Sequence, residues 1–300
     1  MKLLREMKIE GFPRDYLYAR IRCRRAALDL SGHSRWGGPE EPHTTLGAEY
    51  VWVYEQMDRR LRCLLLPVFE YLELRTLVIA LRYMAAGDRS SMDKQLRLSL
   101  LHPQVLKLLK NAKKVALVTA GLERVLEKDR PYFRGLTETY LHQGPGGFEQ
   151  ALVGGCLQWG LSFPCSNPVR GFLLYMLDMR NLLALYKHLY WQVPVNPPLL
   201  TGGTLDIASY EKIWAERNLA DLLVLMGKRA GLNYLPGVND TEEYMLRGLT
   251  TSLKREGRDP LQPGLILDYL WRCQLTARKR ALDLSYAELS AERAAEEVAG

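Results

Sequence analysis

A helix start behind two glycines is the first place in this sequence where chemistry could occur. In LLTGGTL, the backbone amides of Gly202, Gly203 and Thr204 could hold an anion, because unpaired N–H groups and the positive end of a helix attract negative charge. The alternative is a Gly-Gly turn in which Thr204 caps a helix that begins at Asp206. We favour the turn, because the sequence has no phosphate loop of the G-x-x-x-x-G-K-[ST] type and no strand-flanked G-x-G-x-x-G.

Groups for metal binding or covalent catalysis are present but scattered. No pair of histidines has the spacing H-x-x-x-H or H-E-x-x-H, and no G-x-S-x-G or cysteine-centred signature occurs. His188 stands beside Tyr190 and Trp191, so we expect it to pack and not to ligate. We therefore predict no catalytic, cofactor-binding or metal-binding residues. An all-helical enzyme with a dispersed site stays open, but no sequence feature favours it.

The segment YLYARIRCRRAALDLS, residues 16–31, places four arginines among Leu, Ile and Ala. The spacing predicts a helix that starts with Asp15 as its cap and stops at Gly32. It has two apolar stripes, which predict packing on two sides; one is Leu17, Ile21 and Leu28, and the other is Ala19, Cys23, Ala26 and Leu30. For Arg20 and Arg22 we favour ion pairs within the protein over direct contact with a partner.

The basic character of the chain raises nucleic-acid binding as an alternative function. The net charge is +7 and the isoelectric point is near 9.1. Lys107, Lys110 and Lys114 fall on one face of a predicted helix, and 20–25 and 278–280 are further basic runs. Leucines interrupt each run, and Glu123 and Glu127 soon follow. We therefore favour a solvated face, expect no nucleic acid as partner, and keep a basic helical nucleic-acid-binding protein as the alternative.

Composition and cysteine usage place the chain among ordinary globular proteins. Of its 300 residues, 47% are hydrophobic and 25% are charged, so general disorder is not expected. The five cysteines form no C-x-x-C pair and no secretory signal precedes them, which predicts a reducing, cytoplasmic compartment. The longest apolar stretch, 63–86, is interrupted by charges and by Pro67. Any membrane association should therefore be peripheral.

Apolar residues at three- and four-residue spacing predict an all-α protein. Gly/Pro-rich loops are expected at 31–47, around Gly144, at 192–203 and at 256–264. The predicted helices after the first are 48–66, 67–86, 91–100, 102–128, 131–142, 147–160, 169–191, 206–229, 240–255 and 263–283.

Similar helical segments recur along the chain. RTLVIALR begins at Arg75, RNLLALYK at Arg180 and RKRALDLS at Arg278, roughly a hundred residues apart. Glu73 and Asp178 each stand two residues before the first two arginines. Chance likeness of Leu/Arg-rich helices is the alternative, but the near-regular spacing favours three pseudo-repeats. We predict helical lobes at 1–115, 116–225 and 226–300, with the N-terminal helix placed to pack against the third.

Three segments resemble the C-type rotor subunits of A/V-type rotary ATPases, the family that includes the d-type rotor protein of the vacuolar proton pump. The first is Y-x-x-A-R-[IV]-R near the N-terminus, the second is DMRNLLALYKHLYWQ followed by LLTGGTLD, and the third is LDYLWRCQLTARKRALDLS. Gln274, Thr276, Lys279 and Arg280 depart from the family pattern, as in a divergent member. The matching positions are Tyr16, Ala19, Arg20, Ile21, Arg22, Asp178, Asn181, Leu182, Lys187, Gly202, Gly203, Tyr269, Leu270, Trp271, Arg272 and Arg278.

The resemblance implies a fold and a role. The fold is a three-lobed, funnel-like helical protein with pseudo-threefold repeats. The role is that of a non-catalytic rotor protein on the cytoplasmic face of the membrane, which links the central stalk to the proteolipid ring during ion transport. The implied partners are the stalk proteins and the ring, without a cofactor or a small-molecule substrate.

Overall fold

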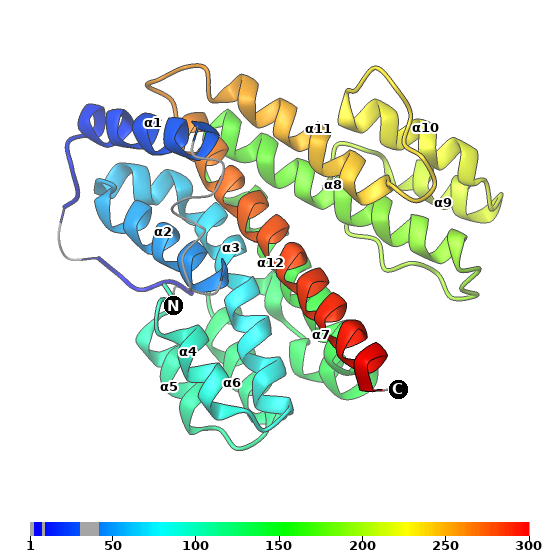
Figure 1. Ribbon diagram of the computed structural model, residues 1–300, viewed down its shortest axis with the longest axis horizontal. Helices are drawn as coiled ribbons and strands as arrows, with labels where there is room; N and C mark the ends of the chain where they lie inside the picture. Colours follow the sequence, from blue (N-terminus) through cyan, green and yellow to red (C-terminus); the bar gives the residue numbers. More distant parts are fainter. Residues whose placement is uncertain (1–2, 8–9, 31–41, 300) are drawn as a thin grey trace.

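The computed structural model describes residues 3–7, 10–30 and 42–299, and this part contains twelve α-helices and one 3-10 helix, η1 (Figure 1). In the same residues the only β-type pairing is one antiparallel bridge between Leu4 and Leu101. The all-α prediction is confirmed. The elements are α1 Arg14–Leu30, α2 Pro42–Gln56, α3 Arg59–Ala85, α4 Arg89–Leu96, α5 Pro103–Asn111, α6 Val115–Glu127, η1 Pro131–Phe133, α7 Leu136–Ser162, α8 Asn167–Tyr190, α9 Ile207–Ala215, α10 Leu219–Ala230, α11 Thr241–Glu256 and α12 Gly264–Ala299.

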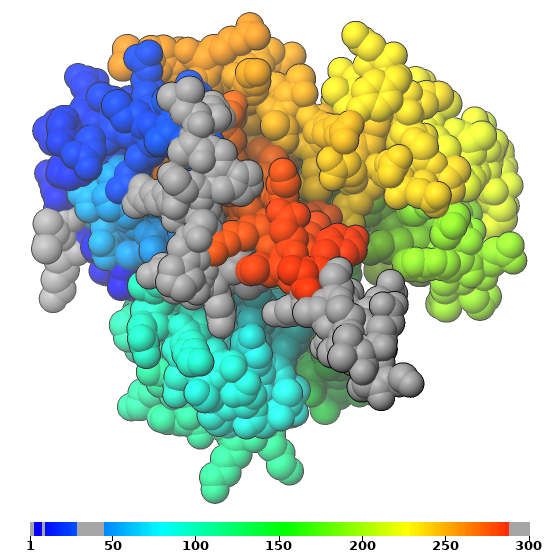
Figure 2. All heavy atoms as spheres, in the orientation of Figure 1, coloured from blue at the N-terminus to red at the C-terminus, as the bar shows by residue number. Residues whose placement is uncertain are grey.

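The long helix α12 crosses the middle of the molecule and packs against α1, α2, α8 and α11 (Figure 1). Its first half is buried on every side, because a helix that is apolar all round needs neighbours all round. Its buried apolar residues are Leu265, Ile266, Leu267, Tyr269, Leu270, Trp271, Cys273 and Ala277. The later part reaches the surface in the middle of the face in Figure 2, where Leu282 and Tyr286 are exposed. No described helix is both long and apolar enough to cross a membrane.

The helix boundary predicted at Pro67 is wrong. α3 continues through Pro67, which is buried in its interior. The chain breaks earlier instead, where Asp58 caps α3 by accepting a hydrogen bond from the amide of Leu61 at 2.7 Å. The expected loop at 31–47 is also shorter, since α2 begins at Pro42, and residues 31–41 lie outside the described part.

Two predicted helices are each divided into two. The helix expected at 102–128 breaks at Ala112 and Lys114, whose backbones are extended. The helix expected at 206–229 breaks at Arg217, which has a φ of 50°, and Asn218 then caps α10 through the amide of Asp221. Neither break contains a glycine or proline, so tertiary packing overrides the helical periodicity.

The other boundaries differ less from the prediction. Gly144, with φ 69° and ψ −163°, kinks α7 where a loop was expected, because glycine adopts this backbone conformation without a Cβ clash. α8 and α11 lie within two residues of their predicted bounds, and α12 extends to Ala299.

α1 packs on one side and not on two. Leu17 and Ile21 are fully buried, which confirms the first predicted stripe. Cys23 of the second stripe is exposed, as are Ala19 and Ala26, so that stripe faces solvent. Asp15 lies in the first turn and is not the cap. The stop expected at Gly32 lies outside the described residues.

Candidate functional site

Asp178 of α8 is the centre of a buried polar cluster. Its side chain is 0% exposed and its Oδ2 accepts a hydrogen bond from Arg229 Nε at 2.5 Å. The amide of Thr204 donates to Oδ1 at 3.0 Å, and the Thr204 hydroxyl donates to Oδ2. A buried carboxylate that is paired and hydrogen-bonded in this way is stabilised as the charged form. It has no role left as an acid or base.

The two glycines let the loop approach this carboxylate. Gly202 has a φ of 94°, a left-handed conformation that favours glycine. A Cβ at Gly203 would lie 2.1 Å from Oδ1 of Asp178. The expected Gly-Gly turn is therefore present, but Thr204 uses its hydroxyl on Asp178 and does not cap α9. The anion that its amide binds is the protein's own carboxylate.

Asn181 fastens the same loop one turn further along α8. Its amide group donates to the carbonyl of Leu200 at 2.8 Å, and its Oδ1 accepts from the amide of Leu200 at 2.8 Å. The structure thus brings together four motif positions from the middle of the chain, Asp178, Asn181, Gly202 and Gly203. Lys187 is exposed and stands apart from them.

A second polar cluster joins the two ends of the chain. Glu49 of α2 is 3% exposed and accepts hydrogen bonds from Arg24 of α1, at 2.6 and 2.9 Å, and from the hydroxyl of Tyr269 of α12, at 2.7 Å. The Arg24 guanidinium lies 3.6 Å from the ring centroid of Trp52. Burial raises the pKa of Tyr269, so its hydroxyl stays protonated and donates to the carboxylate.

Asp268 makes the parallel link between α1 and α12. Its side chain is 0% exposed and accepts from Arg25 at 2.9 Å and from Arg272 at 3.0 Å. Sequence reasoning missed Arg24, Arg25, Glu49 and Asp268 as a set. A signal was available, because Asp268 is the one acid in the apolar run LILDYLW, and a buried acid needs a cationic partner.

The ion pairs expected at Arg20 and Arg22 are not formed with described residues. Both side chains are exposed, and Arg20 instead donates to the Tyr16 hydroxyl at 3.1 Å. The arginines that form pairs are Arg24 and Arg25, because they lie toward α2 and α12 while Arg20 and Arg22 lie toward solvent.

The remaining motif positions near the C-terminus are tied to α11. Trp271 is buried and its indole N–H donates to the hydroxyl of Thr250 at 2.9 Å. Arg278 forms an exposed pair with Glu242 at 2.8 Å. α11 therefore fixes α12 on the side opposite α1.

Two buried glutamates on α3 have different environments. Glu70 is paired with Arg130 through hydrogen bonds of 2.6 and 2.9 Å, and Arg130 lies over the ring of Trp159. Glu73 accepts from the hydroxyl of Ser99 at 3.1 Å. Burial raises the pKa of Glu73 to about 7, so a protonated carboxyl is held in the core near neutral pH.

The histidine and lysine predictions have mixed outcomes. His188 packs edge-on against Trp214 and its Nδ1 lies 2.8 Å from the carbonyl oxygen of Ala184, as expected for a packed side chain. Among the described residues no group of three or more His, Cys, Asp or Glu is placed to hold a metal ion. Lys107 and Lys110 share exposed positions on α5, but Lys114 lies beyond its end, so the predicted single face is wrong.

The chain matches no family model, and no curated protein matches its sequence. The likeness to rotary ATPase rotor proteins therefore depends on the motif residues and on where the fold places them.

Proposed function

We propose that this chain is a non-catalytic central-rotor protein of an A/V-type ATPase, which couples the central stalk to the proteolipid ring for ion transport. The Asp178 cluster is the observation that carries the proposal. Four motif positions from the middle of the chain, distant from one another in sequence, form one buried unit with Thr204 and Arg229. A family motif is expected to persist where its residues depend on one another in this way.

The proposal includes three pseudo-repeated helical lobes, at 1–115, 116–225 and 226–300, arranged as a funnel. In its support, the three helices that carry the repeated segments, α3, α8 and α12, are neighbours in the fold. α1 also packs against α12, so the two ends of the chain are held together. A protein that transmits torque needs such long-range ties, because each lobe must resist rotation relative to the others.

Burial divides the motif positions into two groups. Asp178, Asn181, Tyr269 and Trp271 are buried and act as scaffold. A second group faces solvent without an ion pair to any described residue, and we assign to it the contacts with the stalk or ring; it consists of Tyr16, Arg20, Arg22 and Lys187. Charged residues at the rim of an interface govern association rate and register.

The proposed location is the cytoplasmic face of the membrane, reached through the ring and not by insertion. The net charge of +7 suits a protein held above anionic lipid head groups. No catalytic step is assigned to the chain, because the buried carboxylates of the motif are used in structural hydrogen bonds.

The test is recovery of the tagged full-length chain from membranes in mild detergent, with identification of its companions. We expect the stalk proteins and the proteolipid, and no ATPase activity from the chain alone. The Arg20→Glu, Arg22→Glu double variant should lose at least one companion, while Arg124→Glu, an exposed change on α6, should keep both.

Two outcomes would overturn the proposal. One is recovery of the folded chain without either rotor neighbour. The other is recovery with nucleic acid that is released steeply as salt is raised, which is the signature of phosphate neutralisation. Arg24 and Arg25 are already engaged by acids, so such binding would have to use the exposed lysines of α5.

A further inference from the structure

A cavity of about 250 Å³ lies where α3, α7, α8 and α12 meet. It is open to solvent, and its polar lining comes from helices that are distant in sequence. These polar residues are Tyr50, Tyr71, Arg75, Glu149, Arg180 and Gln274. Two of the three arginines that begin the repeated segments, Arg75 and Arg180, therefore face the same space, and Gln274 lies one turn before the third, Arg278.

Arg180 is a half-buried cation without a carboxylate partner. It forms no ion pair with a described residue, and its Nη2 donates to the neutral Oε1 of Gln150 at 2.8 Å. Its Nε is buried and finds no hydrogen-bond partner among the described residues. A guanidinium removed from water in this way is costly unless an anion compensates it. Nothing in the described lining supplies that anion.

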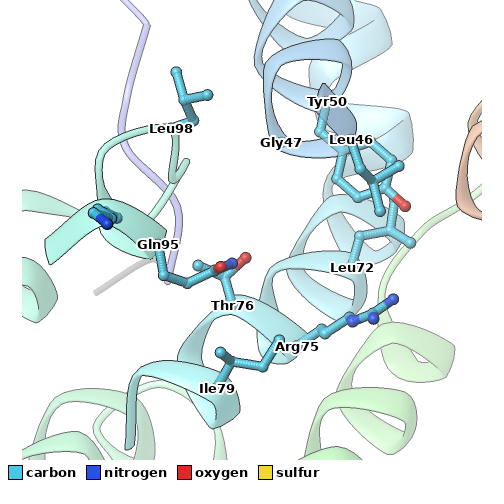
Figure 3. A pocket seen from close by; sticks show the side chains of 10 residues that line it. Leu46, Gly47, Tyr50, Leu72, Arg75, Thr76, Ile79, Gln95 and Leu98 are labelled. Carbon is cyan, nitrogen blue, oxygen red and sulfur yellow. The ribbon is translucent and has the colours of Figure 1, made fainter. Parts of the chain in front are cut away.

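Arg75 adds a second positive charge to the same space. Figure 3 shows its side chain leaving α3 on the same side as the Tyr50 hydroxyl, away from Gln95 and Leu98. Burial lowers the pKa of Arg75, and the positive charge of Arg278 lowers it further, so like charges gather here.

The acids near the cavity are committed elsewhere. Glu149, the one acid in the described lining, holds Arg82 through two hydrogen bonds of 2.9 and 2.7 Å. On α3, Glu73 turns to Ser99, and on α8 Asp178 turns to Arg229. The cavity consequently has an excess of positive charge contributed by separate helices.

We propose that this cavity binds a phosphate group, with Arg75 and Arg180 donating to its oxygens. A planar guanidinium matches the geometry of phosphate oxygens, and a phosphate carries about two negative charges where a carboxylate carries one. The phosphate can belong to a soluble compound or to a lipid head group. The proposal does not depend on the rotor function, since it follows from the lining of the cavity alone.

The test uses two probes on the full-length chain. The first is pyrophosphate, followed by titration calorimetry and by the thermal midpoint. The second is neutral vesicles containing a phosphatidylinositol phosphate, compared with vesicles of equal charge made with phosphatidylserine. Binding of pyrophosphate identifies a soluble ligand, and selective binding of the phosphoinositide vesicles identifies a head group. Either result supports the proposal. Pyrophosphate at about a hundred times its Kd should raise the midpoint by several degrees.

Matched variants separate this site from general charge. Arg180→Gln and Arg75→Gln should each weaken binding about tenfold or more, because each removes charge-assisted hydrogen bonds. Arg124→Gln removes the same charge from an exposed position on α6 and should leave binding unchanged. Without phosphate, Arg180→Gln should melt at or above the wild-type temperature, since it removes an uncompensated cation; this also shows that the variant folds.

The proposal is overturned if the wild-type chain binds neither probe. It is also overturned if Arg180→Gln binds as tightly as Arg124→Gln does, because binding would then follow the overall charge and not the cavity.

Discussion

The Asp178 carboxylate occupies the space in which residue 203 would carry a side chain. Its Oδ1 lies 2.1 Å from the position of a Cβ on Gly203, and the neighbouring amide of Thr204 donates to the same oxygen at 3.0 Å. The glycine is therefore required by a close approach between loop and helix. This relationship links two motif positions that the sequence alone shows only as separate letters.

Gly203→Ala should destabilise the protein by about 2 kcal/mol or more, because an added methyl group meets a carboxylate that is fixed by Arg229 and Thr204. Gly171→Ala is the matched control. It lies on α8 with nothing within 4 Å of the added Cβ, and should stabilise by about 0.5–1 kcal/mol through helix propensity. Urea unfolding of both variants measures the difference. Equal effects would contradict the close approach.

Asp178→Asn should cost about 3–5 kcal/mol, because Arg229 is left as a buried cation without its partner. Arg229→Met should cost a comparable amount. The double variant should be more stable than the sum of the two losses predicts, since both charges are then gone. A double-mutant cycle in urea gives the coupling free energy, and additive losses would show that the pair does not interact.

Arg25→Gln and Arg22→Gln are the same change on neighbouring turns of α1. Arg25→Gln should cost about 1–3 kcal/mol, because Arg25 reaches the buried Asp268 and the carbonyl of Gly257. Arg22 is exposed, and its replacement should cost no more than about 0.5 kcal/mol. Thermal or urea unfolding distinguishes them. A larger loss at Arg22 would reverse the assignment of packed and solvent-facing arginines.

Glu73 should make stability depend on pH. Its pKa is raised to about 7 in the folded protein from an ordinary 4.5, so the folded state binds more protons than the unfolded state between these values. The contribution is fully present below pH 4.5 and is lost as pH rises through 7. Glu73→Gln should flatten this decline and, above pH 7, exceed the wild type by up to roughly 3 kcal/mol.

Glu70→Gln, three residues away on the same helix, is the control for this change. It should destabilise by about 3–5 kcal/mol throughout the pH range, because Arg130 loses a buried partner. Unfolding free energies measured from about pH 5 to 8 test both variants. A pH profile for Glu73→Gln that parallels the wild type would show that another group titrates.

The all-helical class and most helix positions followed from apolar periodicity, since a core-facing stripe is a local property of the sequence. α8 and α11 were predicted within two residues for this reason. The breaks at Ala112 and Arg217 were not predicted, because no glycine or proline marks them and packing overrides propensity there. Pro67 misled in the opposite direction, since a proline inside a long helix can be compensated by its neighbours.

The sequence by itself determined which residues belong to the mid-chain motif, because Asp178, Asn181, Gly202 and Gly203 stand at recognisable spacings. Tertiary structure alone decided how each charge is used. Arg24 and Arg25 are paired while Arg20 and Arg22 face solvent, and Arg180 faces a cavity without an acid of its own. The physical reason is that pairing depends on distance in space, and helices more than two hundred residues apart meet only after folding.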